Sequence, residues 1–204
     1  MYVAERRRPT QAERSARTRS ALLESAARGL SRHGYGNLVL EDVAREAGYT
    51  RGALYHQFKD KEDLALAVLR WAEETWVREV GDVANRQDDP VDALLAMARG
   101  HAVLCRRDIA RVAMALRVEF SGRDHPIALE LERIQAGLVK RLARLIGAGR
   151  RQGSIPPGPP AKTVALALNG ALEGTVIALA GQAPHDEELA AHAAAGVLGV
   201  DAAR

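Results

Sequence analysis

The sequence has one cysteine, few aromatic residues and no long apolar run, and each shortage excludes a class of protein. The single cysteine, Cys105, excludes an intrachain disulfide. No segment reaches about eighteen consecutive apolar residues, because even the stretch 163–180 contains Asn169, Glu173 and glycines, which argues against a transmembrane role. Met1 leads into an Arg-rich polar stretch where a secretory signal would need an apolar run, so we expect a cytoplasmic protein.

Aromatic residues make up only 4% of the 204 residues, whereas alanine, leucine and valine are abundant. This apolar composition favours helices over strands. The length suffices for one large domain, or for a small domain joined to a larger one. We therefore expect an all-α protein.

Charge is distributed unevenly along the chain. The net charge is only +3, but residues 1–60 hold eleven Arg and Lys against seven Asp and Glu. The remainder, residues 61–204, is close to neutral. Only the first segment therefore has the charge expected of a protein that binds a polyanion.

The spacing of apolar residues predicts about nine helices. In the first sixty residues, a helix at 11–33 ends at Gly34, a two-turn helix precedes Gly48, and a third helix at 51–57 is capped by Thr50. A fourth helix is expected to begin at Asp60 and to run to about residue 85. Beyond it, helices are expected at 90–107, 109–120, 125–152, 161–181 and 186–199, with a Pro-rich loop at 153–160.

Two short helices separated by a Gly-containing turn, with a first helix behind them, form a pattern that delivers one exposed helix into the major groove of DNA. The candidate recognition helix runs from Arg51 to Gln57. Its buried face is supplied by Ala53, Leu54 and the following Phe58. Its outward residues are Arg51, Gly52, Tyr55 and His56, a mixture suited to phosphates and base edges. Taken alone, such a stretch could equally be an ordinary solvated helix face.

The run GYGNLVLEDVAREAGYTRGALYHQFKDKEDL at residues 34–64 closely resembles the N-terminal signature of the tetracycline-repressor (TetR) family. VAREAG at 43–48, TRGALYHQF at 50–58 and KDKEDL at 59–64 carry the resemblance, which covers roughly a third of the chain. It implies an N-terminal three-helix helix-turn-helix domain at 1–60. It also implies a C-terminal helical domain at 61–204 that binds a ligand and dimerises.

The resemblance implies two sets of DNA contacts. Phosphate contacts would come from Thr50, Tyr55 and Lys61. Groove contacts would come from Arg51, Gly52 and His56. In addition, Arg6, Arg7 and Arg8 could form an arm that enters a minor groove or neutralises phosphates, or they could be an idle tail.

The sequence departs from the family at the start of the second helix. Threonine is common at these positions in the family. This chain has Leu38 and Val39 there, and neither side chain can cap a helix or bind phosphate. We expect Asn37 to cap the helix instead, one or two residues early.

Family resemblance also implies that the last two long helices pair with the same helices of a second subunit in a homodimer. Small residues would permit close packing there, namely Ala165, Gly170, Ala171 and Gly174. A second argument is independent of the family. One short recognition helix makes few contacts, whereas a two-fold dimer reads two half-sites.

Possible residues of an effector pocket lie between 71 and 180, with Trp76 and Met114 preferred. The candidates are Trp76, Met97, His101, Met114, Arg117 and Glu173. Methionine and tryptophan at helical spacing are more often part of the core than of a binding site. His101 and Cys105 have a spacing that can chelate zinc, but two ligands without a third make an incomplete site. Cys105 also lacks a partner for a redox switch, so no metal and no cofactor other than a small-molecule effector is expected.

These patterns favour a ligand-responsive repressor that binds a pseudo-palindromic operator as a dimer and leaves it when an effector binds. The helix that begins near Lys61 would couple the effector to DNA. Two alternatives remain: a ligand-dependent activator of the same fold, and a helical small-molecule-binding protein that does not use DNA. No Gly-rich phosphate loop, nucleophile elbow or metallohydrolase motif is present, so the sequence gives no support for catalysis.

Overall fold

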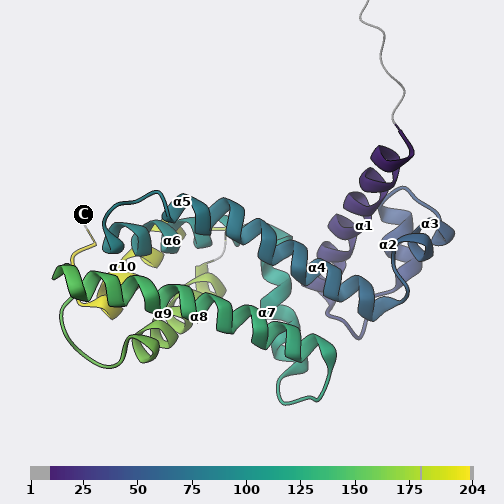
Figure 1. Ribbon diagram of the computed structural model, residues 1–204. Coiled ribbons are helices and arrows are strands. Elements are labelled where there is room, and N and C mark those ends of the chain that lie inside the picture. Colours follow the sequence, from purple (N-terminus) through teal and green to yellow (C-terminus); the bar gives the residue numbers. More distant parts are fainter. Residues whose placement is uncertain (1–9, 180, 203–204) are drawn as a thin grey trace, which may run out of the picture.

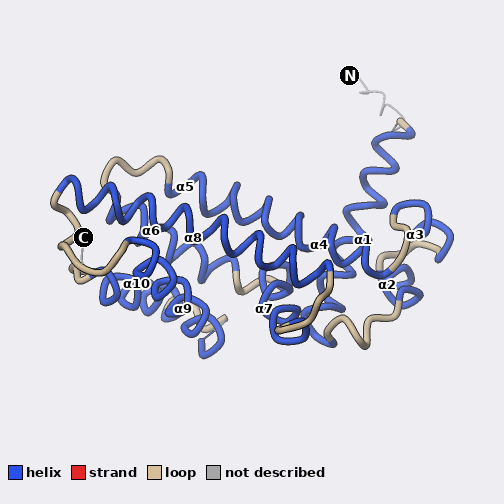
Figure 2. The backbone as a smooth tube through the Cα atoms, turned by 60° about the horizontal axis from the view of Figure 1, so that its bottom comes forward, coloured by secondary structure: helices blue, strands red, loops and turns tan. Residues whose placement is uncertain are grey.

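The computed structural model describes residues 10–179 and 181–202, and within these ranges the protein is all-helical. The predicted arm residues Arg6, Arg7 and Arg8 lie outside the described residues. The molecule is elongated, with α1 to α3 at one end and α9 and α10 at the other (Figures 1 and 2). The elements are α1 (Gln11–His33), α2 (Leu40–Glu46), α3 (Arg51–Gln57), α4 (Lys61–Trp76), the π-helical segment η1 (Val77–Gly81), α5 (Asp82–Ala84), α6 (Pro90–Leu104), α7 (Asp108–Phe120), α8 (Pro126–Gln152), α9 (Ala161–Leu179) and α10 (His185–Leu198).

Local signals explain where the N-terminal helices begin and end. The Thr50 hydroxyl accepts a hydrogen bond from the Ala53 N–H at 3.2 Å, and the Asp60 carboxylate accepts one from the Asp63 N–H at 2.9 Å. Gly48 follows α2 with φ of 78°, a left-handed conformation that strains any residue with a Cβ. The caps and the turn therefore stand where the sequence predicts them.

The predicted cap of α2 is wrong. The side-chain amide of Asn37 donates to the His33 carbonyl at the end of α1, and α2 begins after Val39 without a side-chain cap. Leu38 is instead buried against α1, where the Cδ1 atom of Leu38 occupies the space that a Cβ on Gly29 would need. Packing of this leucine fixes the entry into α2, because no polar group caps it.

The fourth predicted helix is continuous but not regular. Segments α4, η1 and α5 follow one another without a break from Lys61 to Ala84, as the prediction of one helix to about residue 85 requires. Directly after Trp76, however, five residues adopt π-helical hydrogen bonding. Such π segments inside α-helices often occur at functional sites.

Two clusters of buried side chains form the core. The C-terminal cluster joins α6, α8, α9 and α10. The N-terminal cluster contains Leu54 and Phe58 of the helix-turn-helix, together with residues from α1, α2 and α4. It also contains Ile109, Val112, Leu116 and Phe120 of α7, and Ile127 and Leu131 of α8. Three helices of the expected 61–204 domain, α4, α7 and α8, therefore complete the core around the first sixty residues.

Helix α9 is apolar on nearly every side. It is the one helix, among the described residues, that is long and apolar enough to cross a membrane, on length and composition alone, and 33% of its most apolar window is buried inside the protein. Buried helices of folded domains have the same composition. One side of α9 packs on α8 and α10.

Candidate DNA-binding surface and ligand cavity

Helix α3 presents a polar face at the end of the molecule. Leu54 is fully buried beneath it, whereas Arg51, Gly52 and His56 are exposed and Tyr55 keeps 43% of its surface exposed. Leu54 and Phe58 are buried as the sequence predicts, whereas Ala53, which the sequence also assigns to the inward face, is only partly buried. DNA contact by the outward residues remains a prediction.

Arg51 is held loosely at the start of α3. The guanidinium forms an ion pair with Glu41 of α2 at 2.9 Å and lies 5.3 Å from the centre of the Tyr55 ring. Because both partners of the ion pair are largely exposed, the pair is weak and can be exchanged for a phosphate or a base edge. Thr50, predicted to touch phosphate, uses its hydroxyl as the helix cap described above.

Lys61 is more constrained than the sequence suggested. The ammonium donates to the Gly36 carbonyl at 3.0 Å and lies 4.8 Å from the centre of the Tyr35 ring. Partial burial lowers the pKa of Lys61 below its ordinary value. The side chain therefore fastens the loop between α1 and α2 to the start of α4, and its predicted phosphate contact would require this bond to be exchanged.

The same loop is bound from the C-terminal side by Glu119, near the end of α7. One carboxylate oxygen accepts from the Tyr35 N–H at 2.6 Å, and the other accepts from the Gly36 N–H at 2.7 Å. A Cβ on Gly34 would lie 2.8 Å from the Glu119 carboxylate, so the glycine leaves room for this approach. We call the contact between Glu119 and residues 35–36 the α7 joint.

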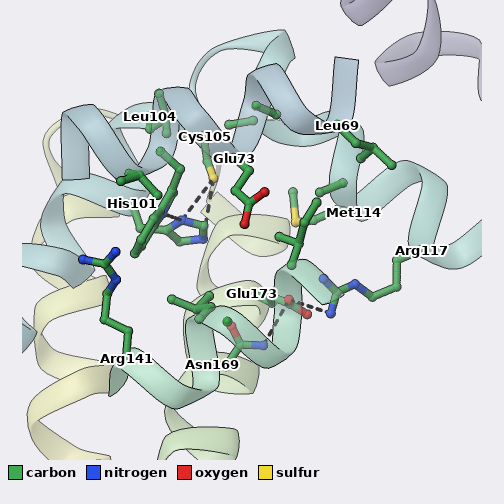
Figure 3. A pocket seen from close by; sticks show the side chains of 18 residues that line it. Leu69, Glu73, His101, Leu104, Cys105, Met114, Arg117, Arg141, Asn169 and Glu173 are labelled. Carbon is green, nitrogen blue, oxygen red and sulfur yellow. Dashed lines mark hydrogen bonds and ion pairs between the residues drawn. The ribbon is translucent and has the colours of Figure 1, made fainter. Parts of the chain in front are cut away.

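A cavity of about 220 Å³ lies in the middle of the molecule, between α4, η1, α6, α7, α8 and α9 (Figure 3). Most of its wall is apolar. The apolar and small lining residues are Leu69, Ala72, Trp76, Val77, Leu104, Cys105, Ala110, Ala113, Met114, Ile134, Gly137 and Leu138. The polar lining residues are Glu73, His101, Arg117, Arg141, Asn169 and Glu173.

The structure brings five of the six predicted pocket residues to this cavity. They are Trp76, His101, Met114, Arg117 and Glu173. The sixth, Met97, is misplaced by the prediction, because its side chain is 1% exposed and packs in the C-terminal core away from the cavity wall. Ligand binding by the other five remains a prediction.

His101 is hydrogen-bonded on the cavity wall. The indole N–H of Trp76 donates to the Nδ1 atom of His101 at 3.2 Å, and the Nε2 atom lies 3.6 Å from the Cys105 sulfur. Burial lowers the pKa of His101 to about 4 and raises the pKa of the Cys105 thiol to about 12. The imidazole is therefore neutral and the thiol protonated at neutral pH, which is a poor environment for a reactive cysteine. The described residues contain no group of three or more potential metal ligands.

The lowered pKa of His101 makes stability depend on pH. Between the ordinary value of 6.5 and the folded value of about 4, the unfolded chain binds more protons than the folded protein. We expect the free energy of unfolding to decrease as pH falls from 6.5 to 4, by about 2 kcal/mol from this residue, and to be independent of His101 above pH 6.5. Urea unfolding of the wild type and of His101→Gln across this range measures the effect. An identical pH dependence in both proteins would contradict it.

The charged residues of the cavity are mostly paired. Arg117 lies 3.3 Å from the Glu173 carboxylate and donates to the Gln135 side chain at 2.7 Å. The Asn169 amide donates to Glu173 at 3.2 Å. Figure 3 shows Arg117 pointing towards Glu173 from one end of the cavity, and Arg141 at the opposite end.

Sequence reasoning missed several residues of the cavity. Leu69, Ala72 and Glu73 lie one and two turns before Trp76 on α4, so helical spacing from Trp76 could have identified them. Ile134, Leu138 and Arg141 share one face of α8 at the same spacing, but no aromatic or unusual residue marks that face. Their part in the cavity follows only from how α8 packs on α4.

The predicted dimer residues divide between two sides of α9. Ala165 is fully buried in the C-terminal core, so its assignment to an interface is wrong. Gly170 and Gly174 are exposed, and Ala171 is partly exposed. They lie near Leu166 and Ile177, which are 45% and 74% exposed. We call the row of Leu166, Gly170, Gly174 and Ile177 the outer face of α9.

An exposed helix suited to a DNA groove, joined through shared helices to a separate ligand-sized cavity, defines the class of helix-turn-helix regulators that sense small molecules. Residues 22–68 match the profile of a family described as "Bacterial regulatory proteins, tetR family". The chain is 30% identical over 139 residues to the HTH-type transcriptional repressor AcnR of Corynebacterium diphtheriae, which covers 68% of this chain and 70% of AcnR. This protein therefore belongs to the TetR family of transcriptional regulators.

Solved structures share the whole fold. The fatty acid degradation regulator FadR from Bacillus halodurans superposes with a TM-score of 0.77 over 95% of this chain and 97% of FadR, at 16% identity. AibR, crystallised with isovaleryl coenzyme A and operator DNA, superposes with a TM-score of 0.71 over 90% of this chain and all of AibR, at 19% identity. At these identities the likeness concerns the fold alone. It confirms the all-α architecture with an N-terminal helix-turn-helix and a C-terminal helical body.

Proposed function

We propose that this protein is a dimeric cytoplasmic repressor that occupies a pseudo-palindromic operator through α3 and is released when a small molecule enters the cavity. The observation that carries the proposal is the arrangement of α4 and α7. Both helices line the cavity, and both also pack in the core of the helix-turn-helix. A ligand that changes their spacing must therefore change the position of α3, provided that it binds the DNA-free conformation more tightly.

Dimerisation is supported by the outer face of α9. Its residues recur at intervals of three and four along the helix and leave a large apolar side chain, Ile177, exposed. Leu189 of the adjacent α10 is 45% exposed and adds to the apolar surface. Two copies that bury this face would bring two recognition helices to two half-sites.

The π-helical segment supports the position of the ligand site. It begins directly after Trp76, and both Trp76 and Val77 line the cavity. A π turn is an irregularity that α-helical bonding could replace, so it gives α4 a second arrangement for a ligand to select.

Arg51→Ala should lower affinity for the operator by about tenfold to thirtyfold, because each subunit loses a charged contact to DNA. Binding is measured with duplexes from the region upstream of the protein's own gene, against a scrambled duplex and at several salt concentrations. Arg86→Ala is the matched control, since Arg86 is exposed at the opposite end of the molecule. An equal loss of operator affinity in both variants would refute the proposed DNA contact. The absence of sequence-selective binding by the wild type would refute it as well.

The sign of regulation is tested with the same operator in a reporter strain. A repressor lowers reporter output until the inducer is added. The relative from Corynebacterium diphtheriae is named a repressor, which favours this sign over activation. Output that rises with the protein present would establish the activator alternative.

A further inference from the structure

Four charged residues line the cavity, two glutamates and two arginines, and which of them are paired bears on the ligand. The Glu73 carboxylate accepts from Arg133, with Nη1 at 3.3 Å from its Oε1 atom. Glu173 and Arg117 neutralise one another at 3.3 Å. That leaves Arg141, which has no carboxylate within ion-pair distance in the part of the chain that the structure describes. Of the four charged residues that line the cavity, Arg141 alone therefore has no ion-pair partner among the described residues.

Arg141 is fixed in place by its surroundings. Its guanidinium lies 5.9 Å from the centre of the Trp76 ring. Its Nη1 atom lies 3.1 Å from the position that a Cβ on Gly81 would take, so the end of the side chain is lodged against η1. The residue is partly buried and lines one end of the cavity (Figure 3). A cation held in a mostly apolar cavity without a counter-charge is unfavourable, and an anion that enters the cavity would relieve it.

A carboxylate is matched to the Arg141 guanidinium, whereas a cation is not. The planar guanidinium presents parallel N–H donors that match the two oxygens of a carboxylate. A cationic ligand would have to compete with Arg133 for Glu73 or with Arg117 for Glu173. Near Trp76 it would meet the positive charge of Arg141, which lies 5.9 Å from the ring centre. The chemistry of the cavity thus selects for negative charge.

The other end of the cavity offers apolar wall beside the paired Arg117 and Glu173. Met114 lies there between Glu73 and Arg117, and Leu69 lies beyond Met114 on the same side of the cavity (Figure 3). The volume of about 220 Å³ corresponds to roughly seven groups the size of a water molecule in the liquid. We infer that the effector is a small apolar carboxylic acid, bound as its anion, with the carboxylate on Arg141 and the apolar body against Leu69 and Met114. The inference rests on the proposed function of the cavity as the effector site.

The test compares ligands that share a shape and differ in charge. Phenylacetate, phenylacetamide and phenethylamine form one set, and octanoate, octanamide and octylamine form a second. Calorimetric titration of the full-length protein at neutral pH should show at least one acid binding about tenfold or more tightly than its amide, with the amine weakest. Equal binding of acid and amide, a preference for an amine, or no binding of either acid at millimolar concentration would overturn the inference.

Variants on α8 assign the preference to one residue. Arg141→Gln should bind acid and amide equally, and Arg141→Lys should keep part of the preference because it keeps the charge. Arg144→Gln is the matched control, since Arg144 is exposed three residues along the same helix. Thermal unfolding of each variant separates a lost contact from a lost fold. An acid preference that survives in folded Arg141→Gln contradicts the assignment.

Operator binding is measured separately in the same samples. Wild-type protein that binds acid but no operator would refute the proposed repressor while leaving the acid site established. Protein that binds operator but binds acid and amide with equal affinity would refute the acid site and leave the proposed repressor function standing.

Discussion

Replacing Ile177 by aspartate should convert the protein to monomers and lower its affinity for a two-half-site operator by at least about a hundredfold. Ile177 is 74% exposed on the outer face of α9. In a two-fold dimer the same residue is present on both sides of the interface, so one substitution places two carboxylates in apolar surroundings. Each charge then loses hydration without gaining a partner.

Light scattering or sedimentation measures the mass of the variant, and gel shifts with one-site and two-site duplexes measure its binding. Val118→Asp is the matched control, because Val118 is 83% exposed on α7 and lies off the outer face of α9. The control should remain dimeric and bind the operator normally. A dimeric Ile177→Asp protein would mean that the subunits meet through another surface.

The sequence predicts the fold well where the signal is local. Thr50, Asp60 and Gly48 mark helix ends through chemistry that involves residues at most four positions away. Asn37 shows the limit of such reasoning. Its side chain bonds to the end of the helix before it, and the next residue, Leu38, packs in the core.

Helical periodicity cannot decide which way an apolar face points when all faces are apolar. Met97 and Met114 both lie among apolar residues of a predicted helix. Met97 packs in the core, yet Met114 lines the cavity. Ala165 and Gly170 are both small residues of α9, but they face opposite sides. Only the packing of α9 on its neighbours separates core from interface.

Contacts between residues far apart in the chain could not be predicted from the sequence. Glu119 bonds to a residue 84 positions away, and nothing in the residues around it predicts a partner. The hypothesis from sequence assigned coupling to α4 alone. The structure adds α7 as a second connection, because Met114 and Arg117 line the cavity and Glu119, two residues later, holds the loop between α1 and α2.

The α7 joint should therefore contribute strongly to the stability of the DNA-binding end. We expect Glu119→Ala to decrease the free energy of unfolding by about 3 kcal/mol, since two charge-assisted hydrogen bonds are lost and two N–H groups are left without their acceptor. Glu119→Gln keeps one acceptor oxygen and should lose about half as much. Glu74→Ala is the control, because Glu74 is exposed on α4.

Hydrogen exchange locates the effect. The amides of Tyr35 and Gly36 should exchange faster in Glu119→Ala, while amides in the C-terminal core keep their protection. Operator affinity should fall at the same time, because this loop positions α2 against α1 and α2 carries the turn into α3. Unchanged exchange at residues 35 and 36 would show that Glu119 does not hold the loop. If exchange rises but operator affinity stays the same, α4 alone connects the cavity to the recognition helix.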